Sequence, residues 1–256
     1  MSIGIEYAIN SYDGGLLITI VFFDLDDTIY DRYVPFYQAF VRFFHVGLYD
    51  KAYDAFKACN YRSIKALADL QDGIITKKEM IIYRFKGGLA DVGIPITDEQ
   101  AIRFSSRYNE EQSRIKLTEN MCAILDCCKL RFDKIGIITN GDAKSQREKI
   151  DRMGLKHWIS PELIIISGEH NVLKPSFEIF MIAGIAARSS PKEMVMIGDS
   201  YQTDVCGAAN YGMKTILMDR HNESAIPGIV IPDYVVNSEE ELLGLLRDNL
   251  YISKYL

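Results

Sequence analysis

The fold is decided by the stretch Val21-Phe22-Phe23-Asp24-Leu25-Asp26-Asp27-Thr28. An apolar segment, Leu16 to Phe23, ends abruptly and is followed by three carboxylates and a hydroxyl. The apolar segment predicts a buried strand, and an extended continuation would place Asp24 and Asp26 on one face. Carboxylates crowded at a strand end repel one another and are costly to desolvate. A divalent cation is the expected counter-charge, and such a site suits the splitting of a phosphate ester by an aspartate nucleophile.

In the second half of the chain, apolar strands alternate with helical patterns. The strand candidates are Lys134–Ile138, Leu163–Ile166, Met194–Ile197, Thr215–Met218 and Tyr234–Val236. Helical patterns fall between them at 119–130, 143–153, 176–187 and 202–210, and a last one begins at Ser238. This alternation predicts an α/β fold with a doubly wound parallel sheet of the Rossmann-like kind, covered by helices on both faces.

Between Asp24 and the later strands lies a segment with helical periodicity only. Apolar residues recur at helical spacing from Val34, and a second long helix is expected from Tyr49 to Leu70. Thr76 and Thr97 each precede a glutamate or glutamine by three residues, as in a capping box that begins a helix. We therefore expect residues 1–30 and 116–256 to form the α/β core, and residues 31–115 to form an inserted all-helical domain.

The composition narrows the class of protein. The 256 residues carry a net charge of −6 without a basic cluster, which argues against binding a nucleic-acid polymer. The five cysteines show no paired pattern, so we expect a reducing, cytoplasmic environment rather than a secreted protein. The apolar run that ends at Phe23 is too short to span a membrane. The sequence does not indicate an oligomeric state.

Polar side chains follow several of the predicted strands. Ligands of doubly wound sheets bind beyond the carboxyl ends of the strands, so these side chains are candidates for one site. The candidates are Asp24 and Asp26 after the first strand, Thr139 and Asn140 after the second, Lys174 in a later loop, and Asp199 and Asp204 after the Met194–Ile197 strand. Their convergence on one edge of the sheet is the main functional signal.

These segments resemble the four motifs of the haloacid dehalogenase-like (HAD) superfamily. The first motif of that family is an apolar strand followed by DxDxT, here FFDLDDT, and the second is a Ser or Thr after a strand, here in IITN. The third is a lysine often followed by proline, here Lys174-Pro175, and the fourth is a GD followed by a second acid, here Asp199 and Asp204. The helical segment lies where the family inserts its type-1 cap.

The resemblance implies a role for each residue. Asp24 would attack phosphorus, and Asp26 would protonate the leaving oxygen and later deprotonate water. Thr139 and Lys174 would hold phosphoryl oxygens, with Asn140 beside them. Mg²⁺ would be bound by Asp24, by the main-chain carbonyl of Asp26 and by Asp199, with Asp204 as a further ligand either directly or through water. The implied activity is Mg²⁺-dependent hydrolysis of a small phosphorylated metabolite through an aspartyl-phosphate.

Two other residues near this site have more than one interpretation. Arg84, in Tyr83-Arg84-Phe85, either pairs with a neighbouring acid or faces the site and binds a substrate anion. Asp27 is not expected to be catalytic, because it would point away from its neighbours, and we expect it to cap or to form a salt bridge. A loose similarity of residues 73–85 to nucleotidase-like members makes a nucleoside monophosphate one candidate substrate.

Two alternatives remain open at the level of sequence. A dehalogenase would use the first aspartate on carbon without metal, but such relatives lack an acid at the position of Asp26. A non-enzymatic phospho-acceptor or binding protein, such as a receiver domain, also combines an acidic cluster, a hydroxyl and a lysine. Receiver domains are much shorter and have no inserted helices, so both comparisons favour the phosphatase.

Overall fold

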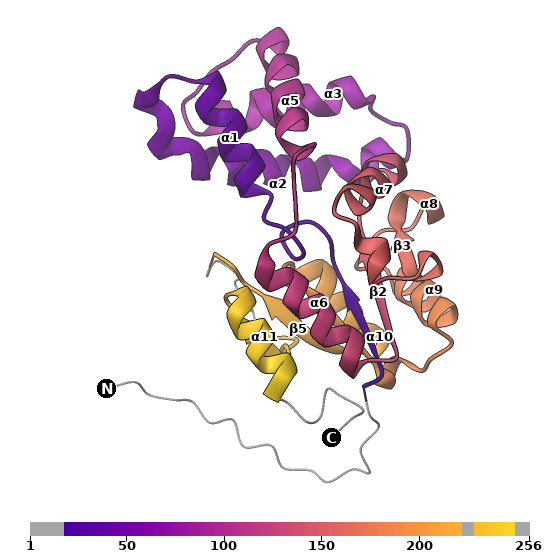
Figure 1. Ribbon diagram of the computed structural model, residues 1–256. Coiled ribbons are helices and arrows are strands. Elements are labelled where there is room, and N and C mark those ends of the chain that lie inside the picture. The colour runs from indigo at the N-terminus through magenta and orange to yellow at the C-terminus, as the bar shows by residue number, and fades with distance from the viewer. Residues whose placement is uncertain (1–17, 222–227, 249–256) are drawn as a thin grey trace.

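The computed structural model describes residues 18–221 and 228–248, which contain a parallel sheet of six strands (Figure 1). The strands are β1 (Ile20–Phe23), β2 (Lys134–Thr139), β3 (Ile164–Ile166), β4 (Met194–Gly198), β5 (Lys214–Met218) and β6 (Tyr234–Val236). They lie in the order β3-β2-β1-β4-β5-β6, and every neighbouring pair is parallel. The predicted doubly wound α/β fold is confirmed.

Alternate residues of β1 enter two different hydrophobic cores. Val21 and Phe23 pack in the core that contains residues of α6 (Glu119–Arg131) and α11 (Glu239–Asp248). Ile20 and Phe22 pack on the other side, with residues of α9 (Phe177–Ala187) and α10 (Cys206–Tyr211). Because successive side chains of a strand point to opposite faces, a sheet covered on both faces requires the continuous apolar run seen in the sequence.

The first strand is shorter than the sequence suggests. It begins at Ile20, and the part of the prediction that falls on Leu16 and Leu17 lies outside the described residues. The Thr19 amide still donates to the Glu193 carbonyl at 2.9 Å, and its carbonyl accepts from the Asp133 amide at 2.8 Å. Thr19, which precedes the first residue of β1, is therefore still hydrogen-bonded to the segments on both sides.

A block of helices connects β1 to the rest of the sheet and stands above it (Figure 1). Its α-helices are α1 (Tyr33–Phe43), α2 (Ala52–Gln71), α3 (Lys77–Ile82), α4 (Gly88–Asp91) and α5 (Asp98–Gln112), with a 3₁₀ helix at Val46–Lys51 and a π-helical turn at Tyr83–Gly87. Both predicted capping boxes form, at Thr76 with Glu79 and at Thr97 with Gln100. The block has an aromatic core of its own, separate from the two cores of the sheet.

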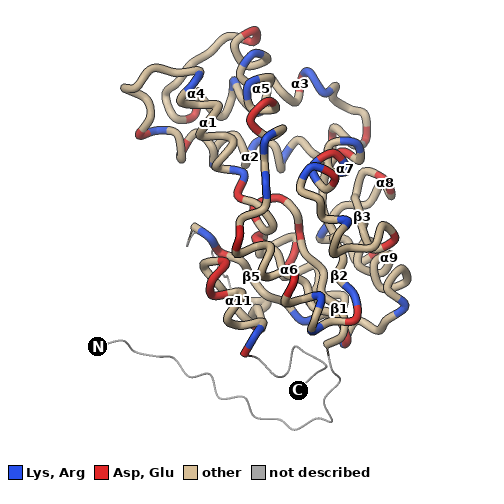
Figure 2. The backbone as a smooth tube through the Cα atoms, viewed as in Figure 1, with Lys and Arg blue, Asp and Glu red and all other residues tan. Residues whose placement is uncertain are grey.

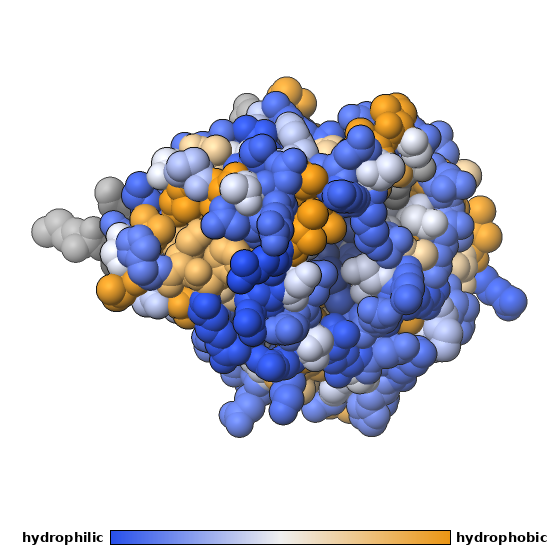
Figure 3. All heavy atoms as spheres, turned by 90° about the horizontal axis from the view of Figure 1, so that it is seen from above, coloured by the Kyte–Doolittle hydropathy of each residue, from blue (hydrophilic) through white to orange (hydrophobic). Residues whose placement is uncertain are grey.

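The surface of the described residues has no single dominant feature. Acidic and basic positions are interspersed over both the helical block and the sheet (Figure 2). Seen from above, the molecule is mostly hydrophilic, and the largest group of hydrophobic residues lies toward the left of the view (Figure 3). None of the helices in the described ranges combines the length and the apolar character needed to cross a bilayer.

Candidate active site

Lys174 joins three of the segments predicted to meet. Its ammonium lies 2.6 Å from Asp24 Oδ1 and 2.6 Å from Asp204 Oδ1, and it also donates to the carbonyl of Ile138 at 2.8 Å. The lysine is only 4% exposed. A buried ammonium with two carboxylates and a carbonyl is fully paired, so the ends of β1 and β2 and the π-helical turn after β4 (Tyr201–Val205) are held around one charge.

Three carboxylates form the acidic part of the site. One oxygen atom each from Asp24, Asp199 and Asp204 lies within 4.8 Å of the others. Asp204 Oδ2 accepts the amide hydrogen of Ser200 at 3.0 Å, and a Cβ on Gly198 would lie 2.3 Å from that oxygen. The glycine of the GD pair is thus needed so that Asp204 can fold back against the end of β4.

The electrostatics of this cluster favour a cation. Burial raises the pKa of Asp24 to about 7, against the opposing charge of Lys174 and with the help of Asp204. Burial, together with Asp27 and Asp24, raises the pKa of Asp199 well above its usual range. Clustered carboxylate oxygens are the ligands that Mg²⁺ prefers, and a divalent ion would relieve their repulsion. The donor set therefore fits Mg²⁺.

Asp26 lies in different surroundings from Asp24. The Lys149 ammonium contacts its two carboxylate oxygens at 2.7 and 2.8 Å, the Tyr30 hydroxyl donates at 2.5 Å, and the Gln146 amide donates at 3.1 Å. Burial alone would raise the pKa of Asp26, but the charges of Lys149 and Arg32 outweigh it and hold that pKa well below its usual range. The pKa values of Asp24 and Asp26 are therefore shifted in opposite directions, although the two residues are only two positions apart.

Thr139, the last residue of β2, and Asn140, which follows it, have two different tasks. Thr139 is buried, and its hydroxyl oxygen accepts from the Gln146 amide at 2.8 Å. Asn140 was expected to bind substrate, but its amide group is used by the main chain of Lys174. Its nitrogen donates to the Lys174 carbonyl at 3.0 Å, and its oxygen accepts from the Lys174 amide at 2.8 Å. Asn140 thus positions the main chain of Lys174, and its expected contact with substrate stays a prediction.

Arg84 and Asp27 differ in whether they form an ion pair among the described residues. The Arg84 guanidinium lies over the rings of Phe85 and Tyr108, 4.6 and 5.2 Å from their centroids. Its buried Nε has no hydrogen-bond partner among the described residues, and no carboxylate pairs with it there. Asp27 accepts from Arg32 Nε and Nη2 at 2.8 and 2.5 Å, so its predicted salt bridge is confirmed.

Sequence reasoning missed the side chains that surround Asp26. These are Lys149 and Gln146, which lie three residues apart on α7 (Ala143–Arg152). The helix follows directly after Thr139 and Asn140, so residues one turn apart on one of its faces could have been marked as candidates. Only the packing of α7 against the end of β1 identifies which face that is.

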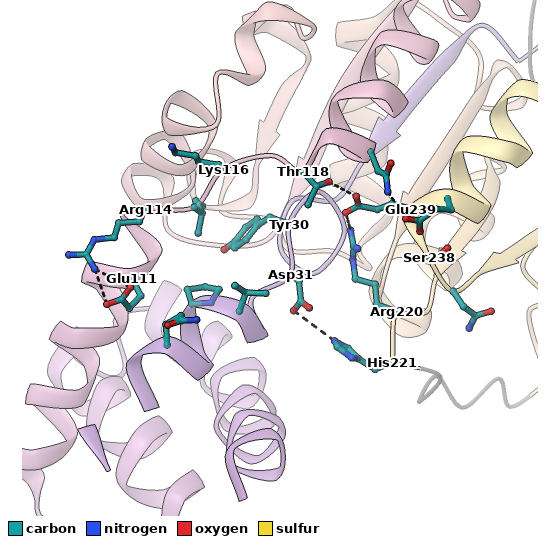
Figure 4. A pocket seen from close by; sticks show the side chains of 17 residues that line it. Tyr30, Asp31, Glu111, Arg114, Lys116, Thr118, Arg220, His221, Ser238 and Glu239 are labelled. Carbon is teal, nitrogen blue, oxygen red and sulfur yellow. Dashed lines mark hydrogen bonds and ion pairs between the residues drawn. The ribbon is translucent and has the colours of Figure 1, made fainter. Parts of the chain in front are cut away.

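A separate cavity lies beside the two connections between the helical block and the sheet (Figure 4). Its volume is about 640 Å³, and its lining includes Tyr30, Asp31, Arg220, His221 and Glu239. Neither the carboxylate cluster nor Lys174 lines it. This cavity is therefore distinct from the acidic site.

The chain combines a parallel sheet, an acidic cluster at the end of the first strand and a helical insertion directly after that strand. The chain belongs to the haloacid dehalogenase-like hydrolase family, whose sequence model matches residues 21–218. This match runs from the second residue of β1 to the end of β5, so it includes all of the predicted site residues.

Curated relatives of the chain are phosphatases and a nucleotidase. It is 28% identical over 241 residues to the pyrimidine 5'-nucleotidase YjjG of Escherichia coli, covering 88% of this chain and 96% of the relative. It is 31% identical to the human N-acylneuraminate-9-phosphatase and 34% identical to a phosphoserine phosphatase of Thermus thermophilus. Those two matches span 51% and 48% of this chain, and only 52% and 48% of the relatives.

Solved structures agree in fold. The magnesium-bound HAD-hydrolase YfnB from Bacillus subtilis is 22% identical, with a TM-score of 0.67 over 90% of this chain and 99% of that chain. The L-2-haloacid dehalogenase RSc1362 is 15% identical, with a TM-score of 0.72 over 91% of this chain and 100% of that chain. At these identities the similarity establishes the fold, and phosphatases and dehalogenases share it.

Proposed function

We propose that this protein is a Mg²⁺-dependent phosphatase that hydrolyses a small phosphorylated metabolite through an aspartyl-phosphate on Asp24. The observation that carries the proposal is the contact of the Lys174 ammonium with Asp24 and Asp204, two buried members of a three-carboxylate cluster. A nucleophile, a cation for phosphoryl oxygens and oxygen ligands for a metal are thereby brought together. Phosphoryl transfer depends mainly on such placement of groups and charge.

The proposed chemistry has two halves. An Asp24 oxygen forms a bond to phosphorus as the bond from phosphorus to the leaving oxygen breaks, and Asp26 gives that oxygen a proton. Water then attacks the aspartyl-phosphate, Asp26 takes a proton from the water, and inorganic phosphate leaves. Thr139 and Lys174 hold the phosphoryl oxygens in both halves.

The low pKa of Asp26 suits the second half, in which it must be ionised. An arriving phosphoryl dianion adds negative charge nearby, which favours the protonated form that the first half requires. Asp24, the main-chain carbonyl of Asp26 and Asp199 would hold Mg²⁺. Asp204, whose two oxygens also accept hydrogen bonds from Lys174 and Ser200, would be a further ligand either directly or through water. The ion would supply positive charge to neutralise the carboxylates and the phosphoryl group.

The helical block is proposed to be a cap, residues 31–115, over a core formed by residues 1–30 and 116–256. Arg84 would bind an anionic or polar group of the substrate, since its buried Nε has no hydrogen-bond partner in the part of the chain that the structure describes and its charge is among those that lower the pKa of Lys149. The match to YjjG over nearly its whole length supports a nucleoside monophosphate as the first substrate to test. The free state of all five cysteines supports a cytoplasmic location.

The proposal is tested with purified protein and p-nitrophenyl phosphate, followed by a screen of phosphorylated metabolites that includes nucleoside monophosphates. We expect phosphate release with Mg²⁺ and its loss in EDTA. Asp24→Asn keeps the size of the side chain but removes the nucleophile, so we expect a loss of at least about a thousandfold in kcat with an unchanged melting temperature. Full activity of this variant would exclude Asp24 as the nucleophile.

A dehalogenase is the alternative class that shares this fold. It would release halide from a 2-haloacid in EDTA and would leave p-nitrophenyl phosphate intact. The proposal predicts the opposite result for both substrates, so the same two assays decide between the classes.

A further inference from the structure

Gln146 is at the centre of the polar contacts on one side of the site. Its amide nitrogen lies 2.8 Å from Thr139 Oγ1, 3.1 Å from Asp26 Oδ2 and 3.2 Å from the Asn140 carbonyl oxygen. The residue is 2% exposed. One buried amide group therefore connects the hydroxyl of the second motif to the second aspartate of the first.

The direction of the hydrogen bond to Thr139 follows from its neighbours. A carbonyl oxygen and an ionised carboxylate can only accept, so the group of Gln146 that faces Asn140 O and Asp26 must be its NH₂. The nitrogen of this NH₂ cannot accept a hydrogen bond, so in its 2.8 Å contact with Thr139 it donates and the hydroxyl oxygen accepts, with its two hydrogens shared among the three acceptors. The hydroxyl of Thr139 consequently keeps its own hydrogen for another acceptor, and it donates to no group among the described residues.

Residues near Gln146 in the sequence allow it to contact Thr139. Asp142 caps α7 by accepting from the Ser145 amide at 3.0 Å, and Gln146 falls at the end of the first helical turn. Gly141 has a φ of +154°, and a Cβ there would lie 3.0 Å from Gln146 Cγ and Cδ. The glycine between Asn140 and Asp142 thus leaves room for the glutamine to reach back over the end of β2.

We infer that Gln146 is a positioning residue that orients the Thr139 hydroxyl as a hydrogen-bond donor to the bound phosphoryl group. This inference rests on the proposed function, because the acceptor is the phosphoryl oxygen of the substrate. Without the amide, the hydroxyl would be free to donate to Asp26 or to the Asn140 carbonyl, and its contribution to phosphoryl binding would be lost.

The test compares Gln146→Glu, Gln146→Met and the isosteric Thr139→Val, alone and combined. A glutamate accepts the Thr139 hydrogen, so Gln146→Glu should lower kcat/KM for p-nitrophenyl phosphate by about 100-fold, and Gln146→Met by about 10-fold. In the Thr139→Val background, Gln146→Met should cost no more than about twofold, because residues that act through one another are not additive. Lys144→Met is the matched control, because this lysine lies on the same helix with its side chain 85% exposed. The kcat/KM of this variant should equal that of the wild type.

Binding of inorganic phosphate in the presence of Mg²⁺, measured by calorimetry, is the second readout and needs no turnover. Gln146→Met and Thr139→Val should each weaken phosphate binding by about tenfold, and the double variant should bind no more weakly than Thr139→Val. Thermal unfolding of each variant checks that the fold is intact.

Additive losses would show that Gln146 does not act through Thr139, and they would overturn the inference. A wild type that does not bind phosphate would overturn it as well. A wild type that binds phosphate but hydrolyses no phosphate ester would contradict the proposed function alone, since the calorimetric comparison would still decide the role of Gln146.

Discussion

At the scale of single residues, the site separates two neighbouring aspartates by giving them different cations. Lys174 contacts Asp24, whereas Lys149 contacts both oxygens of Asp26. The outcome for the pKa differs because Asp24 also faces the other buried carboxylates, which oppose its ionisation. The Asp26–Lys149 pair is therefore a source of stability as well as a part of the site.

Replacing Lys149 should destabilise the protein in a pH-dependent way. At neutral pH, Lys149→Met leaves the Asp26 carboxylate without its main counter-charge, and we expect a loss of about 1–3 kcal/mol in the free energy of unfolding. The folded pKa of Asp26 is depressed, so the pair stabilises the fold above the ordinary carboxyl pKa of 3.8, and this stabilisation is lost as the pH falls below it. The difference between wild type and variant should thus shrink on acidification.

Urea unfolding at about pH 7 and at about pH 3 measures this difference. The exposed Lys144→Met variant should stay within about 0.5 kcal/mol of the wild type at both values. A Lys149→Met effect that is equal at both pH values would show that the ion pair is not its source.

At the scale of elements, the helical block is held together by its own aromatic core. The Phe104 ring of α5 is fully buried, and its centroid lies 5.4 Å from that of Phe36 and 5.2 Å from that of Phe85. These rings join α1, α5 and the π-helical turn that carries Arg84. The position of Arg84 therefore depends on packing inside the block rather than on the sheet.

Truncation of Phe104 should loosen this block more than the sheet. Phe104→Ala is expected to cost about 3–5 kcal/mol, as is usual when a buried aromatic ring is removed. Hydrogen exchange should accelerate in α1, α2 and α5, while β1, β2 and β4 stay protected, because the hydrophobic cores are separate. Ile64→Ala, at a residue 62% exposed, is the control and should change little. Uniform acceleration would mean that block and sheet unfold as one unit.

At the scale of the whole molecule, the sheet order concentrates the acidic groups. β1 lies between β2 and β4, so the carboxyl end of the central strand receives polar groups from both neighbours. The two connections of the helical block leave from this same end, and α7 reaches the block through the hydrogen bond from Arg152 to the Gln112 carbonyl at 3.0 Å. Site and insertion are thus adjacent because of topology.

Binding of Mg²⁺ should become tighter as the pH rises. A pKa of about 7 means that metal-free Asp24 is largely protonated below that pH, and the proton must leave before the carboxylate can bind the ion. The apparent affinity should fall by up to about tenfold for each pH unit below 7 and level off above it. Calorimetry in two buffers of different ionisation enthalpy measures both the affinity and the released proton. Equal affinity from about pH 6 to about pH 8 would contradict the assignment.

The sequence by itself was sufficient to predict the parallel sheet and the helical insertion. It also identified the principal candidate site residues, which are Asp24, Asp26, Thr139, Lys174 and Asp199. These follow from local patterns: apolar runs that end in polar groups, helical spacing and turn residues, all of which act over a few positions of the chain. Only the tertiary structure decided what those residues touch. That Asn140 holds the main chain of Lys174, and that Gln146 and Lys149 surround Asp26, depends on how α7 packs over β1 and β2. Contacts between segments more than a hundred residues apart depend on the three-dimensional packing of the whole chain, which a local pattern does not record.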